Sequence, residues 1–138
     1  MRELPRQLTA DELAELFSGR TRLVERLAER EDPLRAADDV IAELSEDDKA
    51  EALAAHPRIG EPSSEQRGAE PEVLAELAKL NRAYEDRFGF RFVVFVNGRT
   101  RAELLPVLSE RLGRTRDEEL ETGLAELVAI ARDRWQRG

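Results

Sequence analysis

The chain contains no cysteine, one histidine, and only two lysines among its 22 basic residues. Without cysteine no disulfide can form, and a single histidine makes a structural zinc site untenable, so we expect no bound metal. The formal net charge of −8 argues against a nucleic-acid binder, which needs a basic stripe. No apolar run approaches the roughly 20 residues that span a bilayer, and the N-terminus lacks an apolar signal core. We therefore expect a cytoplasmic protein that contacts neither nucleic acid nor membrane.

What the sequence does contain is one helix signal after another. Its 138 residues, 41% of them hydrophobic, fit one domain over 1–138. Four capping motifs precede apolar stripes at helical spacing, namely Thr9-x-x-Glu12, Ser45-x-x-Asp48, Thr100-x-x-Glu103 and Thr115-x-x-Glu118. The β-like run at 90–96 ends at Asn97-Gly98, and one such run cannot build a sheet. The prediction is an all-α, single-domain multi-helix bundle with one short extended segment at about 90–96.

His56 is the leading candidate for chemistry. It stands where a helix should end, directly before a loop rich in proline and glycine, and an imidazole exchanges protons near neutral pH. Glu65, nine positions later, could hold the ring in one tautomer and raise its pKa above about 6.5. The competing interpretation is structural: His56 caps the preceding helix, and Glu65 is an acid at a helix N-terminus that favours the macrodipole.

Other residues indicate how a ligand could be held. The amide of Gln66 both donates and accepts, which suits a ring carbonyl or a urea group. Ser63 and Ser64 are expected caps that could also contact a ligand. An extended backbone at 90–96 that pairs with nothing would offer its N–H and C=O groups to a small heterocycle. The sequence has no glycine-rich phosphate loop and no dinucleotide fingerprint, so we expect an enzyme without a cofactor.

The order of these motifs resembles one known family. His56-Pro57, Glu65-Gln66, Leu80-Asn81-x-x-Tyr84 and Phe88-Gly89-Phe90-x-Phe92, followed by Arg-Leu and Glu-Glu pairs near the C-terminus, are similar to 2-oxo-4-hydroxy-4-carboxy-5-ureidoimidazoline (OHCU) decarboxylase from about Thr9 to Trp135. The resemblance implies an all-α fold that usually forms homodimers. It also implies a cofactor-free carboxy-lyase that catalyses the last step of urate breakdown, to (S)-allantoin and CO2.

The resemblance also assigns roles to residues of the expected site. His56 would be the catalytic proton donor and acceptor, and Glu65 would orient it and touch the heterocyclic acid substrate. Many relatives carry arginine where this chain has Asn97, and Arg99 would lie on the same side if the backbone stays extended, so we expect Arg99 to take over the carboxylate contact. The expected substrate-binding residues are Pro57, Ser63, Ser64, Gln66, Val93, Val94, Phe95, Val96, Asn97 and Arg99.

Two alternatives stay open at this point. Pro62 stands where the family has a serine, and Asn97 replaces an arginine, so the chain could be a paralogue that acts on a related ureido or imidazoline acid. The second alternative is a non-catalytic helical interaction module in which His56 only caps a helix.

Overall fold

The computed structural model describes residues 8–56 and 71–137, and in these two stretches the chain forms seven helices and no strand. This confirms the expected all-α class. The helices are α1 (Ala10–Phe17), α2 (Arg22–Ala28), α3 (Ala37–Glu43), α4 (Glu46–Ala54), α5 (Pro71–Phe88), α6 (Arg101–Leu112) and α7 (Arg116–Arg137). None of the described helices is both long enough and apolar enough to cross a membrane.

The predicted capping motifs start four of these helices. At α1, Thr9 Oγ1 accepts a hydrogen bond from the Glu12 amide at 3.1 Å, and Glu12 Oε1 accepts one from the Thr9 amide at 3.0 Å. These bonds satisfy N–H groups that have no partner inside the helix. The same reciprocal pair recurs at Thr100 with Glu103 and at Thr115 with Glu118, and Ser45 caps α4 through the Asp48 amide.

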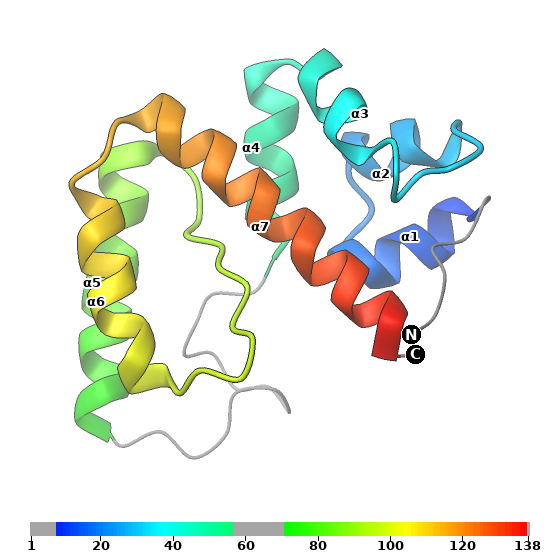
Figure 1. The fold of residues 1–138 in the computed structure, drawn as a ribbon. Coiled ribbons are helices and arrows are strands. Elements are labelled where there is room, and N and C mark those ends of the chain that lie inside the picture. The colour runs from blue at the N-terminus through cyan, green and yellow to red at the C-terminus, as the bar shows by residue number, and fades with distance from the viewer. Residues whose placement is uncertain (1–7, 57–70, 138) are drawn as a thin grey trace.

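Helix α7 is the element that joins the molecule. Figure 1 shows α1 to α4 on one side, the α5 and α6 pair on the other, and α7 running diagonally across. It packs on α1, α3 and α4. Gly123, in the middle of α7, explains how close α4 comes: a Cβ at this position would lie 3.2 Å from Leu53 Cδ2. The end of α4 that precedes His56 is therefore held tightly against α7.

The predicted extended segment is confirmed at 90–96. It runs back from the end of α5 to the start of α6, so that both helices run in the same direction (Figure 1). Its aromatic side chains pack on α5, with the ring centroids of Tyr84 and Phe92 at 5.3 Å. The segment ends in a turn in which Asn97 and Gly98 have φ values of +48° and +78°. This left-handed pair is what an Asn-Gly dipeptide favours.

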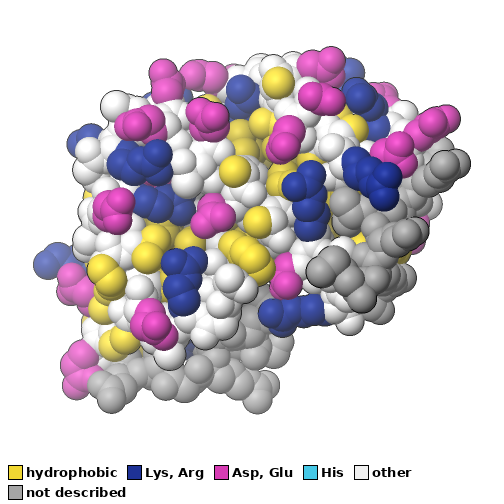
Figure 2. All heavy atoms as spheres, in the orientation of Figure 1, with side chains coloured by type: hydrophobic (Ala, Val, Ile, Leu, Met, Phe, Trp, Pro, Cys, Tyr) yellow, Lys and Arg dark blue, Asp and Glu magenta, His cyan; other side chains and the backbone are white. Residues whose placement is uncertain are grey.

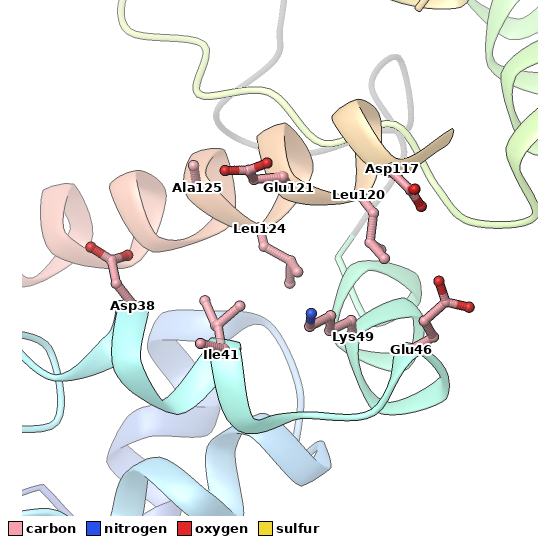
Figure 3. Close-up of a pocket in the computed structure, with 10 residues that line it drawn as sticks. Asp38, Ile41, Glu46, Lys49, Asp117, Leu120, Glu121, Leu124 and Ala125 are labelled. Carbon is pink, nitrogen blue, oxygen red and sulfur yellow. The ribbon is translucent and has the colours of Figure 1, made fainter. Parts of the chain in front are cut away.

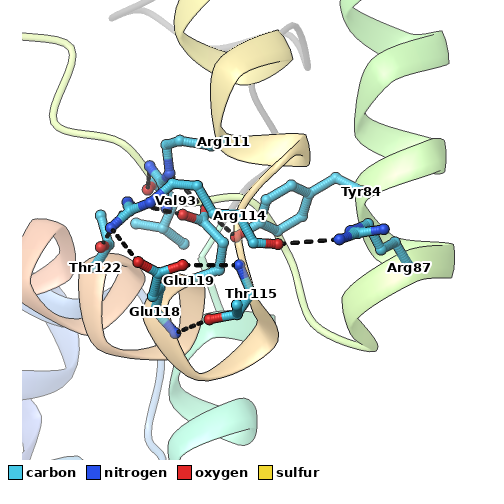
Figure 4. Close-up of polar contacts among 9 residues, drawn as sticks. All are labelled: Tyr84, Arg87, Val93, Arg111, Arg114, Thr115, Glu118, Glu119 and Thr122. Carbon is cyan, nitrogen blue, oxygen red and sulfur yellow. Dashed lines mark hydrogen bonds and ion pairs between the residues drawn. The ribbon is translucent and has the colours of Figure 1, made fainter.

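A buried carboxylate holds this segment in place (Figure 4). The side chain of Glu119, in the first turns of α7, is fully buried. Its Oε1 accepts hydrogen bonds from Tyr84 Oη and Arg111 Nε, both at 2.7 Å. Arg111 also donates to the backbone oxygen of Val93 at 2.8 Å. One carboxylate thus links α5, α6, α7 and the extended segment, while burial and the bond to Glu119 raise the pKa of Tyr84 and keep it a donor.

We predict that Glu119→Gln strongly destabilises the protein. The amide cannot balance the charge of Arg111, which is 5% exposed, and breaking a buried pair costs about 3–5 kcal/mol. The matched control is Glu121→Gln, an exposed position on the same helix, where we expect a change within about 0.5 kcal/mol. Urea unfolding at neutral pH measures both. Equal free energies of unfolding for the two variants would contradict this role.

Candidate active site

His56 lies directly after α4, where the sequence predicts it. Its backbone amide donates to the carbonyl of Leu53 at 3.2 Å, which closes the last turn. The ring is half-buried, and its Nδ1 lies 3.4 Å from the Oγ of Ser18, the residue that ends α1. Arg91 at the start of the extended segment donates to the carbonyl of His56 at 3.0 Å. The histidine is thus fixed between α1 and the extended segment.

Helix α7 contributes the third wall of this site. Arg134, near its C-terminal end, donates to Ser18 Oγ at 2.7 Å and to the carbonyl of Leu16 at 3.0 Å. Two guanidinium groups, those of Arg134 and Arg91, therefore lie close to His56. Four segments far apart in the sequence meet here: the ends of α1, α4 and α7 and the extended segment.

These surroundings keep the imidazole neutral. Burial, together with the charges of Arg134 and Arg91, lowers the pKa of His56 from 6.5 to about 4. The described surroundings therefore act against the expected rise of the pKa of His56 above its usual value. That expectation depended on Glu65, which lies outside the described residues together with Pro57, Ser63, Ser64 and Gln66. The roles of these five residues stay predictions.

The extended segment differs from the expected unpaired backbone. The carbonyl of Val93 accepts from Arg111, and those of Phe95 and Val96 accept from Arg99 at 2.6 and 3.1 Å. The side chains of Val93 and Val94 are buried in the core, so they cannot contact a ligand without a change of packing. Within the described part of the chain, the amides of 93–97 donate to no backbone carbonyl. Three carbonyls of this segment are thus bound to arginines, while its N–H groups make no backbone hydrogen bond within the described residues.

Arg99 does not lie as the sequence suggested. The backbone does not stay extended to this residue, because Asn97 and Gly98 reverse it. The Arg99 amide donates to the Val96 carbonyl at 3.0 Å, and its guanidinium folds back onto the segment before the turn. Asn97 is exposed at the tip of the turn. These two side chains are therefore not on one side of an extended strand, although Arg99 still borders the segment.

Sequence reasoning missed Ser18, Arg91 and Arg134. Ser18 and Arg91 are separated from His56 by 38 and 35 positions, and Arg134 is 116 positions from Ser18. Such contacts arise from tertiary packing and leave no local motif. The one available signal was the high arginine content of a protein with a net negative charge. It suggests that many arginines make fixed hydrogen bonds and do not simply keep the protein soluble.

A hollow lies between α3, α4 and α7, away from His56 (Figure 3). Its volume is about 590 Å³, and Lys49 reaches into it among the carboxylates of Asp38, Glu46, Asp117 and Glu121. Its lining thus carries four acidic side chains and one basic one. It also lies at the other end of α4, roughly 15 Å from His56 at about 1.5 Å per residue. No group of three or more metal-ligating side chains occurs among the described residues.

These features define an α-helical protein whose site is built around a neutral histidine flanked by guanidinium groups. The OHCU decarboxylase family model matches residues 2–136, and the chain belongs to this family. It is similar to the uric acid degradation bifunctional protein PucL of Bacillus subtilis, with 27% identity over 97% of this chain and 31% of that protein. It is 29% identical to an OHCU decarboxylase of Haloferax volcanii over 72% of this chain and 67% of that protein.

The fold is shared with a solved structure. A crystal structure of OHCU decarboxylase in the presence of (S)-allantoin superposes with a TM-score of 0.77 at 29% identity, covering 89% of this chain and 94% of that one. The chain spans about a third of the length of the bifunctional relatives, 31% in PucL.

The lowered pKa of His56 predicts a specific pH dependence of stability. Between pH 6.5 and about 4 the histidine of the unfolded chain binds a proton that the folded site rejects, so stability falls as pH is lowered through this window. His56→Gln lacks this contribution. We expect the difference in unfolding free energy between the two proteins to shift against the wild type from pH 7 to pH 4.5. An NMR titration midpoint of His56 near 6.5 would contradict the prediction.

Proposed function

We propose that the protein is a cofactor-free decarboxylase of urate catabolism. It converts 2-oxo-4-hydroxy-4-carboxy-5-ureidoimidazoline to (S)-allantoin and CO2, with His56 as general acid and base. Membership of the OHCU decarboxylase family carries this proposal. The position of the one histidine, half-buried between Ser18, Arg91 and Arg134, supports it.

The chemistry needs one proton delivered to one face of a carbon. Loss of CO2 leaves an electron pair on carbon, and the conjugated ring of the substrate delocalises it. A neutral imidazole has one nitrogen that accepts a proton and one that donates it. His56 is neutral at pH 7, so its N–H gives a proton to the carbon, and the other ring nitrogen takes up a replacement proton from solvent, which returns the ring to its neutral form. Its fixed position makes the delivery one-sided, and a positioned acid contributes roughly 10²–10⁴-fold.

The remaining site roles are part of the same proposal. Glu65 orients His56 and touches the substrate, Gln66 binds the heterocycle, and Pro57, Ser63 and Ser64 line the site. The N–H groups of 93–97 bind the amide edge of the ring, which fits the commitment of three carbonyls in this segment to Arg111 and Arg99. We also propose that 1–138 forms a single domain that works in the cytoplasm as a homodimer, as the family resemblance implies.

The first alternative was a paralogue that acts on a related substrate. One of the two residues that suggested it, Asn97, has a structural explanation. Asn97 has φ +48°, a conformation that asparagine tolerates better than arginine does. The turn therefore accounts for this residue without any change of substrate. Membership of a decarboxylase family favours an enzyme over a non-catalytic module.

We predict that His56→Asn abolishes stereospecific formation of allantoin while the protein stays folded. No second histidine exists to replace it. The assay supplies urate, urate oxidase and hydroxyisourate hydrolase, and follows the circular dichroism of the product. We expect the rate to fall by roughly 10²–10⁴-fold.

Lys49→Gln, in the acidic hollow at the other end of α4, is the matched control and should keep the wild-type rate. A folded His56→Asn protein with the wild-type rate would rule out the acid and base role. Loss of activity in Lys49→Gln, with activity retained in His56→Asn, would indicate that the active site is the acidic hollow and not the region around His56.

Arg99 is proposed to bind the substrate carboxylate. Its bonds to two carbonyls fix the guanidinium and use only part of its donor set. A charge-assisted hydrogen bond contributes about 1.5–3 kcal/mol, so Arg99→Ala should lower kcat/KM by about tenfold or more. Arg82→Ala, at an exposed position on α5, should leave it unchanged. If Arg99 only locks the turn, its loss will lower the melting temperature and leave kcat/KM equal to that of the control.

A further inference from the structure

A relay of side chains from α7 and the end of α1 reaches the ring of His56. Arg134 donates to Ser18 Oγ at 2.7 Å, and the same oxygen lies 3.4 Å from His56 Nδ1. A guanidinium has only donors, so Ser18 is the acceptor in the first contact. The hydroxyl proton of Ser18 is then directed to another acceptor, and the unprotonated nitrogen of a neutral imidazole lies next to it. Donation from Arg134 polarises the hydroxyl and makes it a better donor.

The backbone at Ser18 shows that this placement has a conformational cost. Ser18 has φ +66°, in the left-handed region where glycine or asparagine is usual. The next residue, Gly19, packs against α4: a Cβ there would lie 3.0 Å from the Cβ of Ala55. The turn is thus pressed onto the residue that precedes His56. A serine rather than a glycine at the left-handed position is a backbone outlier that points to a role for its hydroxyl.

We propose that Ser18, held by Arg134, is a positioning residue that donates its hydroxyl proton to Nδ1 of His56 and so fixes the tautomer with the proton on Nε2. This inference rests on the proposed role of His56 in the reaction. The neutral ring then presents an Nε2–H donor to the reacting substrate. The 3.4 Å contact is long for a hydrogen bond, and such contacts commonly tighten when substrate binds.

The variant Ser18→Gly distinguishes hydrogen bonding of the Ser18 hydroxyl to His56 from the part that residue 18 plays in ending α1. Glycine is the favoured residue at a left-handed cap, so this variant removes the hydroxyl and keeps or improves stability. The net contribution of one neutral hydrogen bond corresponds to a fall in kcat of about 2- to 10-fold, with KM unchanged. Ser18→Asn, which tolerates the same backbone and keeps an N–H donor, should recover part of the loss. An unchanged kcat in a stable Ser18→Gly protein would overturn the proposal.

The tautomer itself can be read without any activity. The chain has one histidine, so its ¹⁵N spectrum contains a single imidazole pair. At pH 7 we expect a protonated Nε2 and an unprotonated, hydrogen-bonded Nδ1 in the wild type, and a shift of the Nδ1 resonance in Ser18→Gly. A protonated Nδ1 in the wild type, or identical spectra for both proteins, would overturn the proposal. Because this readout needs no substrate, it stays decisive even if the decarboxylase assignment fails.

Arg134→Gln tests the first link of the relay. It should lower kcat in the same way as Ser18→Gly and raise the pKa of His56, because it removes a nearby positive charge. The control is Arg137→Gln, one turn further along α7, where the arginine is exposed and pairs with Asp133 at 2.9 Å. Equal kcat values and equal histidine pKa values for the two variants would remove Arg134 from the relay. If Arg134→Gln does not fold, the Ser18 variants decide.

Discussion

The buried carboxylate of Glu119 is the contact on which the rest of the structure depends. An extended segment in a helical protein has no neighbouring strand, so its backbone groups need other partners. Arg111 supplies one by donating to the Val93 carbonyl, and it can lie in the core because Glu119 balances its charge. Burying such a pair offers little net stability, whereas its geometry is specific. The network therefore fixes where 90–96 lies more than it strengthens the fold.

The same helix that carries Glu119 also carries Arg134 to the site. Helix α7 has 22 residues, about 33 Å at 1.5 Å per residue. Its first turns hold the extended segment, and its last turns hold Ser18 at the end of α1. His56 lies between these two supports, bonded through its carbonyl to Arg91 of the segment and facing Ser18 through its ring. The end of α1 and the extended segment are thus both positioned by one continuous helix, and an error in its register would displace both.

Local signals predicted most of the fold, while the site depended on contacts that no local signal records. The four capping motifs, the end of α4 at His56 and the extended run are read from a few neighbouring residues, because caps and pleats are short-range. The Asn97-Gly98 pair is also a local signal, because it favours a chain reversal, and this reversal places Arg99 back along the extended segment. Ser18, Arg91 and Arg134 reach His56 only through packing between distant segments. In the sequence, Glu119 resembles any acidic residue in the first turn of a helix. It differs from Glu118 only because it lies on the same buried face of α7 as Gly123 and Leu127.

Among the described residues, the charges nearest to His56 are opposite in sign to the net charge of the whole protein. The chain has a net charge of −8, and this charge repels at long range the anionic substrate of the proposed reaction. Salt screens such repulsion beyond about 8 Å at physiological ionic strength, so the local groups decide binding. Arg134 and Arg91 bring positive charge close to the ring, and burial of the ring, together with these two charges, keeps His56 neutral at pH 7. Under the proposed function, one arrangement serves two needs of decarboxylation: its positive charge favours binding of a carboxylate, and it keeps the imidazole in the neutral form that can both accept and return a proton.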